Sequence, residues 1–441
     1  MSKNTNNNTF DLGILCGNFL SMKDHSTAIS ENIFMGIKDG HIVHVGTENK
    51  KASCAQFVDA SNKLVMPGLV NAHAHLPMHL FRGLADDEPF DVWLWKNILP
   101  LEAKLLSPEF VRLGTELSLL EALSFGITSI YDMYYFEDEI ADVCDKAGIR
   151  ALLGENFSSF PAPDDKDQKG NDLKIIERML EKYGTNHERI RPMISPHAPY
   201  TCTDEKLKAA RDLSLKTGLH IGVHVAETKG ELDTSLKEFN KTPVQRFHDI
   251  GLSDAPCLYA HCVHVSDEDI QLMKKKDVRV SHNPEANMKL GAGAAPVPKM
   301  LKAGLKVGIG TDSVASNNDF NLWKEMDFAA KLAKLSNSDN TAMTANDALK
   351  LATSLGAQAM GFDKTGQLRE GFQADFLVLD MNRVNLKPVH SIPSLLVYST
   401  TGAEVESTYC QGRLLYEKGN FKTLDRDSIL ERSQKYIKEN F

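Results

Sequence analysis

The rhythm of apolar and polar positions changes twice along the chain. From about residue 10 to residue 65, short apolar runs separated by turn residues predict β-strands, and the segment Lys38–His41 is typical of a hairpin turn. Between about residues 67 and 355, short apolar runs alternate with helical stretches such as 109–126 and 266–276. Beyond that point the pattern returns to strands over 366–380 and 404–419, and a final helix is predicted over 426–440.

The middle region predicts a closed barrel. Alternating strands and helices indicate βα units, and eight such strands favour closure over an open sheet. The expected fold class is therefore α/β: a (β/α)8 TIM barrel with a small β-sandwich built from both ends of the chain. We expect the N-terminal part of the sandwich at 1–66, the barrel at 67–365, and the C-terminal part with the final helix at 366–441. The predicted barrel strands are 68–75, 127–133, 150–157, 191–199, 219–227, 256–264, 278–285 and 305–313.

Composition and charge exclude several classes of partner. A chain of 441 residues fits a large barrel with an accessory domain. The net charge of −9 and the lack of a basic block argue against a nucleic-acid partner. No run of 18 apolar residues predicts a membrane span, and the N-terminus lacks the pattern of a signal peptide. The seven cysteines, odd in number and without a CxxC pair, indicate reduced thiols and a cytoplasmic protein.

The first predicted barrel strand ends in two histidines. His73 and His75 are two residues apart, so on a strand both imidazoles point to the same face and could chelate one metal ion. A pair of hydrogen-bonded structural histidines is the competing interpretation. Catalytic groups of such barrels lie at the C-terminal ends of the strands, which is where this pair stands.

Three further strands also end in chemically active residues. His224 is a third candidate ligand, and Glu227 beyond it is a candidate acid and base, unless it is a surface carboxylate in an ion pair. His261 follows an apolar run directly, whereas His264 fits a structural role better. Asp312 is a fourth ligand or a base, or else caps a turn. Because independent structural roles would have to coincide at one end of four strands, the joint pattern favours a metal-dependent hydrolase.

Several segments together resemble one family. VMPGLVNAHAHLPMHLFRG, SPHAPYT, HVAET, AHCVH, NPEANMKLGAGAAPV and GTDSVASNN are similar to the amidohydrolase superfamily, and within it to the branch of methylthioadenosine / S-adenosylhomocysteine deaminases with the related triazine chlorohydrolases. The resemblance runs from about Asp11 to about Glu417. It implies metal ligands His73, His75, His224 and Asp312, a catalytic acid/base pair Glu227 and His261 assisted by Asp312, and substrate contacts from Glu102, His197, Glu227 and Asp312.

The resemblance also implies the cofactor and the assembly. Binuclear relatives carry a bridging lysine at the end of the fourth strand, whereas this strand ends Ser195-Pro196-His197. One metal ion per chain is therefore expected, zinc or in some cases iron, with a position left open for water. Members of this branch form homo-oligomers, so a dimer or tetramer is expected. A non-catalytic barrel is the rival class, but it should have lost ligands, and the matched set here is complete.

The expected reaction is hydrolytic deamination of an adenine nucleoside. Glu102 matches the carboxylate that receives ribose hydroxyls, and we expect it on a loop reaching over the barrel mouth rather than as an exposed charge at a helix start. Trp93 and Trp95 could line the apolar end or pack in the core. The stretch 154–174 contains no arginine to grip an amino-acid carboxylate, which favours 5′-methylthioadenosine, 5′-deoxyadenosine or adenosine over S-adenosylhomocysteine. The alternative is a chlorohydrolase or aminohydrolase of a triazine or another N-heterocycle such as guanine.

Overall fold

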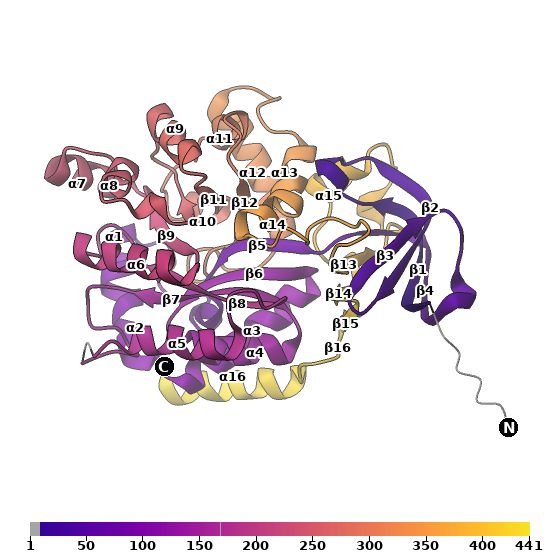
Figure 1. Ribbon diagram of the computed structural model, residues 1–441, viewed down its shortest axis with the longest axis horizontal. Helices are drawn as coiled ribbons and strands as arrows, with labels where there is room; N and C mark the ends of the chain where they lie inside the picture. Colours follow the sequence, from indigo (N-terminus) through magenta and orange to yellow (C-terminus); the bar gives the residue numbers. More distant parts are fainter. Residues whose placement is uncertain (1–8, 168) are drawn as a thin grey trace.

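The computed structural model describes residues 9–167 and 169–441, and its centre is a closed barrel of eight parallel strands. Each predicted barrel strand is confirmed within a few residues (Figure 1). Around the ring the strands follow one another in the order β10-β11-β12-β5-β6-β7-β8-β9. Their bounds are β5 (Leu69–Ala74), β6 (Ile127–Tyr134), β7 (Arg150–Phe157), β8 (Ile190–Pro196), β9 (Ile221–Val225), β10 (Cys257–His261), β11 (Arg279–His282) and β12 (Val307–Ile309).

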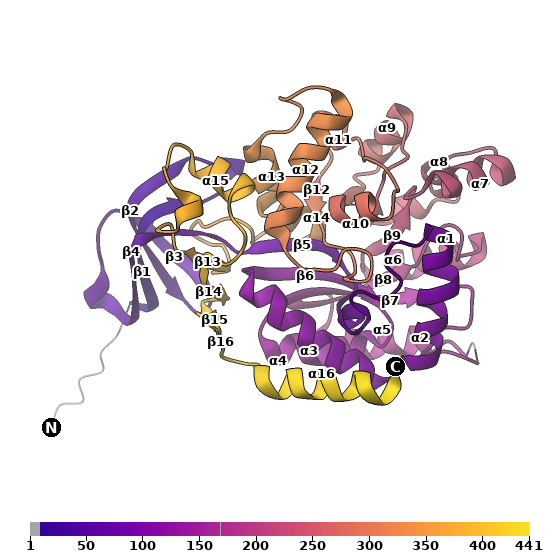
Figure 2. The same ribbon diagram turned by 180° about the vertical axis from the view of Figure 1, so that it is seen from behind.

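Helices surround the barrel and cover its outer face (Figures 1 and 2). The bounds of the α-helices are α1 (Phe90–Val92), α2 (Leu99–Leu105), α3 (Pro108–Ser124), α4 (Glu137–Ala147), α5 (Asn171–Tyr183), α6 (Asp204–Thr217), α7 (Lys229–Phe239), α8 (Pro243–Asp249), α9 (Asp267–Lys275), α10 (Pro284–Lys289), α11 (Val297–Lys302), α12 (Leu322–Asn337), α13 (Ala345–Leu351), α14 (Ser354–Met360), α15 (Ile392–Tyr398) and α16 (Arg426–Asn440). Short 3-10 helices are η1 (Lys23–His25), η2 (Lys51–Ser53), η3 (Leu76–Phe81), η5 (Leu252–Asp254) and η6 (Val384–Leu386), and η4 (Trp93–Ile98) is a π-helix. No helix of the described residues is long and apolar enough to cross a membrane.

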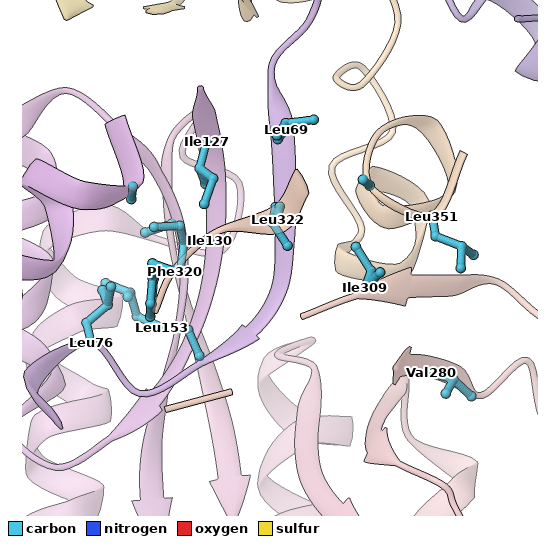
Figure 3. Packing of buried hydrophobic residues seen from close by; sticks show 14 of the residues in the cluster. Leu69, Leu76, Ile127, Ile130, Leu153, Val280, Ile309, Phe320, Leu322 and Leu351 are labelled. Carbon is cyan, nitrogen blue, oxygen red and sulfur yellow. The ribbon is translucent and has the colours of Figure 1, made fainter. Parts of the chain in front are cut away.

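The barrel strands are buried on both faces, as expected for a parallel sheet under a layer of helices. Every residue of β6 and β7 is buried. Figure 3 shows how the side chains pack: Leu69, Ile130 and Leu153 come from neighbouring strands, and Ile309 and Val280 continue the core on the other side of β5. Because strand interiors are apolar, polar side chains at strand ends stand out in the sequence.

The two ends of the chain form one eight-stranded mixed sheet beside the barrel. The strand order is β16-β15-β14-β13-β4-β1-β2-β3, so the C-terminal strands join the N-terminal ones where β13 pairs antiparallel with β4. The small β domain expected from both terminal segments is thereby confirmed, while the exact boundaries at 66/67 and 365/366 stay a prediction. The bounds are β1 (Phe10–Leu20), β2 (Ile29–Lys38), β3 (His41–Gly46), β4 (Cys54–Pro67), β13 (Phe376–Leu379), β14 (Val405–Cys410), β15 (Arg413–Glu417) and β16 (Asn420–Phe421).

Local chemistry explains several junctions of this sheet. Lys38 and His41 pair across the predicted hairpin, and Asp39 and Gly40 between them both have positive φ, as a two-residue type I′ turn requires. β4 ends at Pro67 and runs directly into β5, so the terminal sheet delivers the chain to the first barrel strand. The final helix α16 lies along α3 (Figure 2), where the Tyr436 ring packs 5.9 Å from that of Phe110.

Candidate metal and active site

The four predicted metal ligands converge at the C-terminal end of the barrel. His73 and His75 come from the end of β5, His224 from β9, and Asp312 from the turn after β12. The Nε2 atom of His224 lies 3.1 Å from Nε2 of His73 and 3.4 Å from Nε2 of His75. The Oδ1 atom of Asp312 lies 3.1 Å from Nε2 of His75 and 3.7 Å from Nε2 of His73.

This donor set fits a metal ion. Four ligands at about 2.0–2.1 Å from a tetrahedral zinc ion lie about 3.4 Å from one another, which matches these separations. Nδ1 of His75 donates to the Met133 carbonyl at 2.6 Å, and Nδ1 of His224 donates to the His197 carbonyl at 2.8 Å. These two bonds fix the tautomers, so both Nε2 atoms carry lone pairs and face one another. A cation between them turns that repulsion into attraction.

The backbone around the ligands is held in unusual conformations. Ala226, His261, Cys262 and Asp312 all have positive φ, at 51°, 72°, 49° and 61°. Such conformations cost about 1–3 kcal/mol each in non-glycine residues and persist where the surroundings fix them. The Asp312 amide is fixed by a 3.0 Å hydrogen bond to the carbonyl oxygen of His73. Strain therefore gathers where the strands present their polar ends.

The predicted acid/base pair lies next to this cluster. His261 donates from Nδ1 to Oδ1 of Asn287 at 2.8 Å, and this Nδ1 is 3.8 Å from Oε1 of Glu227. His261 is close enough to His73 and His224 to form a second possible ligand triad with them. The structure thus brings both residues to the cluster, and their assignment as proton carriers rather than ligands stays a prediction.

The two predicted substrate contacts line the same cavity. Glu102 lies on α2 rather than on a loop, in the first turn of the helix, yet only 5% of the residue is exposed. The hydroxyl of Tyr134 donates to its Oε1 at 2.7 Å. His197 lies after β8 with its ring 4.9 Å from that of His224. His73 is buried behind the cavity wall, and the wall contains the other seven of the eight predicted site residues: His75, Glu102, His197, His224, Glu227, His261 and Asp312.

Comparison with known proteins identifies the family to which this fold belongs. The model of the amidohydrolase family matches residues 64–415. This chain belongs to the amidohydrolase family. A 5-methylthioadenosine/S-adenosylhomocysteine deaminase of Caldanaerobacter subterraneus subsp. tengcongensis is 39% identical over 93% of this chain and 94% of its own length. A 5'-deoxyadenosine deaminase of Methanosarcina mazei is 41% identical over 91% and 92%. The crystal structure of an adenosine deaminase from Xanthomonas campestris with bound zinc is 31% identical, covers 98% of both chains, and has a TM-score of 0.92.

Burial sets the protonation states in this amidohydrolase site. It lowers the pKa of His73 and of His224 well below the usual range, with further lowering from the neighbouring imidazoles, so both stay neutral and able to ligate. Burial alone would raise the pKa of Asp312, but the hydrogen bond with His75 and the nearby imidazoles hold it well below its usual range. Burial would lower the pKa of His75, but the hydrogen bond with Asp312 and the charge of that carboxylate raise it. A divalent ion binds to the neutral form of all three imidazoles beside the ionised carboxylate, so its binding displaces any proton from His75.

The remaining carboxylates of the site have raised pKa values. Burial raises the pKa of Glu227, and it raises that of Glu102 to about 7. A raised pKa favours the protonated form, which the predicted general acid Glu227 requires, whereas Glu102 changes its charge near neutral pH. Burial lowers the pKa of His197 to about 4, which leaves that ring neutral.

Sequence reasoning missed several residues that shape the amidohydrolase site. Glu231 accepts the backbone N–H of Ala226 at 2.7 Å and of Glu227 at 2.9 Å, and so fixes the turn that presents Glu227. Tyr134 holds Glu102, and Asn156 lines the cavity with a buried Oδ1 that lacks a partner among the described residues. No sequence motif marks any of these residues. The one signal is that Glu231 follows Glu227 by four residues at the start of a helix, a position from which it could be predicted to contact the turn.

The aromatic residues near the mouth divide into two groups. Trp93 lines the cavity, and its buried indole nitrogen lacks a partner within the described part of the chain. Trp95 instead is 43% exposed, with its ring 6.4 Å from those of Phe160 and Tyr200.

His264 lies apart from the ligand cluster and donates from Nε2 to the Ala292 carbonyl at 2.8 Å.

Proposed function

We propose that this protein hydrolytically deaminates an adenine nucleoside, foremost 5′-methylthioadenosine, to the inosine derivative and ammonia. The observation that carries the proposal is a single cavity that joins the four-ligand cluster to the buried carboxylate of Glu102. A carboxylate accepts the two vicinal hydroxyls of a ribose well, whereas a free base or a triazine offers it none. Relatives about 40% identical are named for 5-methylthioadenosine, S-adenosylhomocysteine and 5'-deoxyadenosine deamination, which supports the same substrate class.

The proposed cofactor is one zinc ion per chain, with iron as the alternative metal. His73, His75, His224 and Asp312 would hold it, since their donor atoms match the spacing that a tetrahedral ion needs. When bound, the ion supplies Lewis-acid activation of water. Elemental analysis of the purified protein should find about one transition metal per chain, and a chain that never takes up metal would contradict the proposal.

The side chains then divide the proton transfers of the reaction. Glu227 protonates N1 of the purine, which makes C6 more open to attack by water, and Asp312 accepts a proton from that water. The ionised Glu227 then takes the proton of the new C6 hydroxyl and delivers it to the amino group, which leaves as ammonia while C6=O forms. The proton held by Asp312 returns to Glu227 and restores both carboxyl groups. His261 orients the attacking oxygen and stabilises the charge that develops there. Burial raises the pKa of Glu227, which favours the protonated form that this role needs.

The rest of the cavity positions the nucleoside. Glu102, which the Tyr134 hydroxyl holds in place, receives the ribose hydroxyls. The neutral ring of His197 faces the purine. The loop after β7 carries no arginine, and its Lys169 is paired with Asp167 at 2.7 Å. A small apolar 5′ substituent therefore suits the site better than an amino-acid carboxylate.

A panel of substrates tests the assignment. Ammonia release should be measured with 5′-methylthioadenosine, 5′-deoxyadenosine, adenosine, S-adenosylhomocysteine, adenine and guanine, and chloride release with a chlorotriazine. The proposal expects the highest kcat/KM for a nucleoside with a small 5′ group. Preference for guanine or the triazine, left intact by Glu102→Ala, would establish the alternative heterocycle hydrolase.

We also propose that the enzyme works as a homodimer or homotetramer in the cytoplasm, without nucleic-acid or membrane partners. The oligomer rests on the frequency of symmetric assemblies among such enzymes. The cytoplasmic location rests on the cysteines, all seven of which are free thiols in the described residues. Light scattering that shows a monomer at working concentration would refute the oligomer.

A further inference from the structure

A second cavity opens at the other end of the barrel, where the strands begin. Its volume is about 700 Å³. Arg150 and Arg279 are the first residues of β7 and β11, Arg191 is the second residue of β8, and His220 precedes β9. The loop after α14 closes one side of this cavity, and residues of the terminal sheet reach its rim. The catalytic groups lie at the opposite ends of the same strands.

Two guanidinium groups of this cavity have no carboxylate partner. Arg150 forms a buried ion pair with Asp375, with Nε to Oδ2 at 2.8 Å. Arg191 instead donates only to the carbonyl oxygens of His187 and Gly361, at 3.0 and 2.9 Å. Arg279 donates to Nδ1 of His220 at 3.2 Å. Within residues 9–167 and 169–441 neither lies within 4 Å of a carboxylate. Asp363 acts on Arg191 from a greater distance, as does Asp277 on Arg279, and Asp277 is itself paired with Lys306.

The two unpaired guanidinium groups meet at Gly361. Arg191 binds its carbonyl, and a Cβ on Gly361 would lie 3.0 Å from Nη1 of Arg279 and 2.7 Å from Cε1 of His220. The φ of +76° at this position also favours glycine. The ring of Phe362 lies 4.4 Å from Cζ of Arg191 and 5.4 Å from Cζ of Arg150. Like charges are thus packed together in a half-buried setting instead of being spread over the surface.

The other ionisable groups of the cavity leave a net positive lining. Lys364 adds a third positive charge, while Glu188 and Asp363 line the cavity as exposed carboxylates. Glu188 is 3.5 Å from His41 at the rim. Burial, and then the charges of Arg279 and Arg191, lower the pKa of His220 to about 4, so His220 is neutral. Its Nδ1 accepts from Arg279, which leaves Nε2–H as a further donor.

We propose that this cavity binds a small phosphate-type dianion, as inorganic phosphate or as a phosphate monoester. Paired guanidinium groups present N–H donors in forks that match phosphate oxygens, and a dianion would neutralise Arg191 and Arg279 together. Backbone carbonyls occupy part of the Arg191 fork and the His220 ring occupies part of the Arg279 fork, and none of these neutral acceptors cancels a guanidinium charge. The chain as a whole has a net charge of −9 and therefore repels anions, whereas the positively charged lining of this cavity attracts them.

Thermal unfolding of the full-length metal-loaded protein tests this proposal. Inorganic phosphate and glycerol 2-phosphate are titrated at millimolar concentrations against sodium chloride of equal ionic strength. A ligand of the folded state raises Tm in a saturable way. We expect a saturable rise of about 2 °C or more with phosphate and none with chloride. Whether glycerol 2-phosphate acts as strongly distinguishes a monoester site from one for the free ion.

Variants locate the binding and separate it from the metal centre. Arg191→Gln with Arg279→Gln should abolish the phosphate shift while nucleoside deamination persists, and Arg413→Gln, an exposed arginine outside the cavity, should keep both. If the double variant does not fold, Thr185→Glu places a carboxylate in the cavity lining and should abolish the shift with both arginines present. A phosphate shift that survives in either cavity variant, or that chloride reproduces, overturns the proposal.

Discussion

Replacing Glu102 by Gln should weaken binding of nucleosides far more than binding of a free base. The amide keeps the size of the side chain and can still accept the Tyr134 hydroxyl, now at 2.7 Å from Oε1, but it removes the charge. Hydrogen bonds to charged groups contribute about 1.5–3 kcal/mol and neutral ones about 0.5–1.5 kcal/mol, so two ribose contacts lose about 2–3 kcal/mol together. At 1.36 kcal/mol for each factor of ten, kcat/KM for the nucleoside should fall about 30- to 150-fold. The inhibition constant of adenine, which has no ribose, should stay unchanged.

The pH dependence of the same residue has a definite sign. Burial raises the pKa of Glu102 to about 7, so the carboxyl of the free enzyme is protonated below that pH. Receiving two hydroxyls requires the ionised form. The KM for the nucleoside should therefore fall as pH rises towards about 7 and then level off, and the Gln variant should lack this component. KM should be measured for both proteins by steady-state kinetics over pH 5–9. The ratio of the two KM values then isolates the pH dependence that comes from Glu102.

The free energy of unfolding of the native protein should fall as pH rises, whereas nucleoside binding improves. The unfolded chain loses this proton near pH 4.5, whereas the folded chain holds it to about pH 7, so stability falls over that interval as pH rises. The shift of about 2.5 units corresponds to about 3 kcal/mol above pH 7. Glu102→Gln should then be more stable than the native protein at pH 8 and equal to it at pH 4.5, as measured by urea unfolding. A variant that is less stable at pH 8, and that loses nucleoside and adenine binding equally, would show that Glu102 is only a packing residue.

Four further substitutions separate the other roles. Glu227→Gln should abolish turnover with metal content retained, whereas His73→Ala should lose both; metal analysis beside the activity assay decides, and loss of metal from Glu227→Gln with activity restored on reloading would reverse the assignment. Glu231→Gln should lower kcat more than it raises KM, because it loosens the turn that carries Glu227; an equal change in both would contradict a positioning role. Asp375→Ala should cost about 3–5 kcal/mol in urea unfolding, because it leaves Arg150 buried and unpaired; a loss below about 1 kcal/mol would show that water or another group replaces Asp375.

The parts of the molecule that follow local rules could be predicted from the sequence. The eight barrel strands are short apolar runs between helical stretches, and burial on both faces of a parallel sheet imposes that pattern. His73 and His75 share a face because a strand repeats every two residues. The Asp39-Gly40 pair predicts a hairpin because both residues tolerate the positive φ that they have in the structure. The ligand set could be predicted because polar residues at strand ends depart from the apolar pattern.

Contacts between distant elements could not be predicted in this way. Glu102 and Tyr134 are 32 residues apart on different elements, and no periodicity relates them. The position of Glu102 well beyond His75 in the chain predicts a loop over the barrel mouth, whereas in the structure a π-helix followed by α2 carries it into the cavity. The meeting of Arg191 and Arg279 at Gly361 likewise depends on which strands are neighbours at the base of the barrel.

The two ends of the barrel present the same electrostatic problem with opposite sign. At the C-terminal ends of the strands, the imidazole lone pairs of His75 and His224 face one another beside an ionised Asp312, an arrangement that a cation stabilises. At the N-terminal ends, Arg191 and Arg279 both approach Gly361 beside a neutral His220, an arrangement that an anion stabilises. Holding like groups close together destabilises the folded protein in each case, and a bound counter-charge offsets that cost. Since both clusters stand on strands of one barrel, occupation of either should raise the unfolding temperature of the whole barrel. Metal and phosphate should therefore stabilise the native protein additively, because the two sites share no residue.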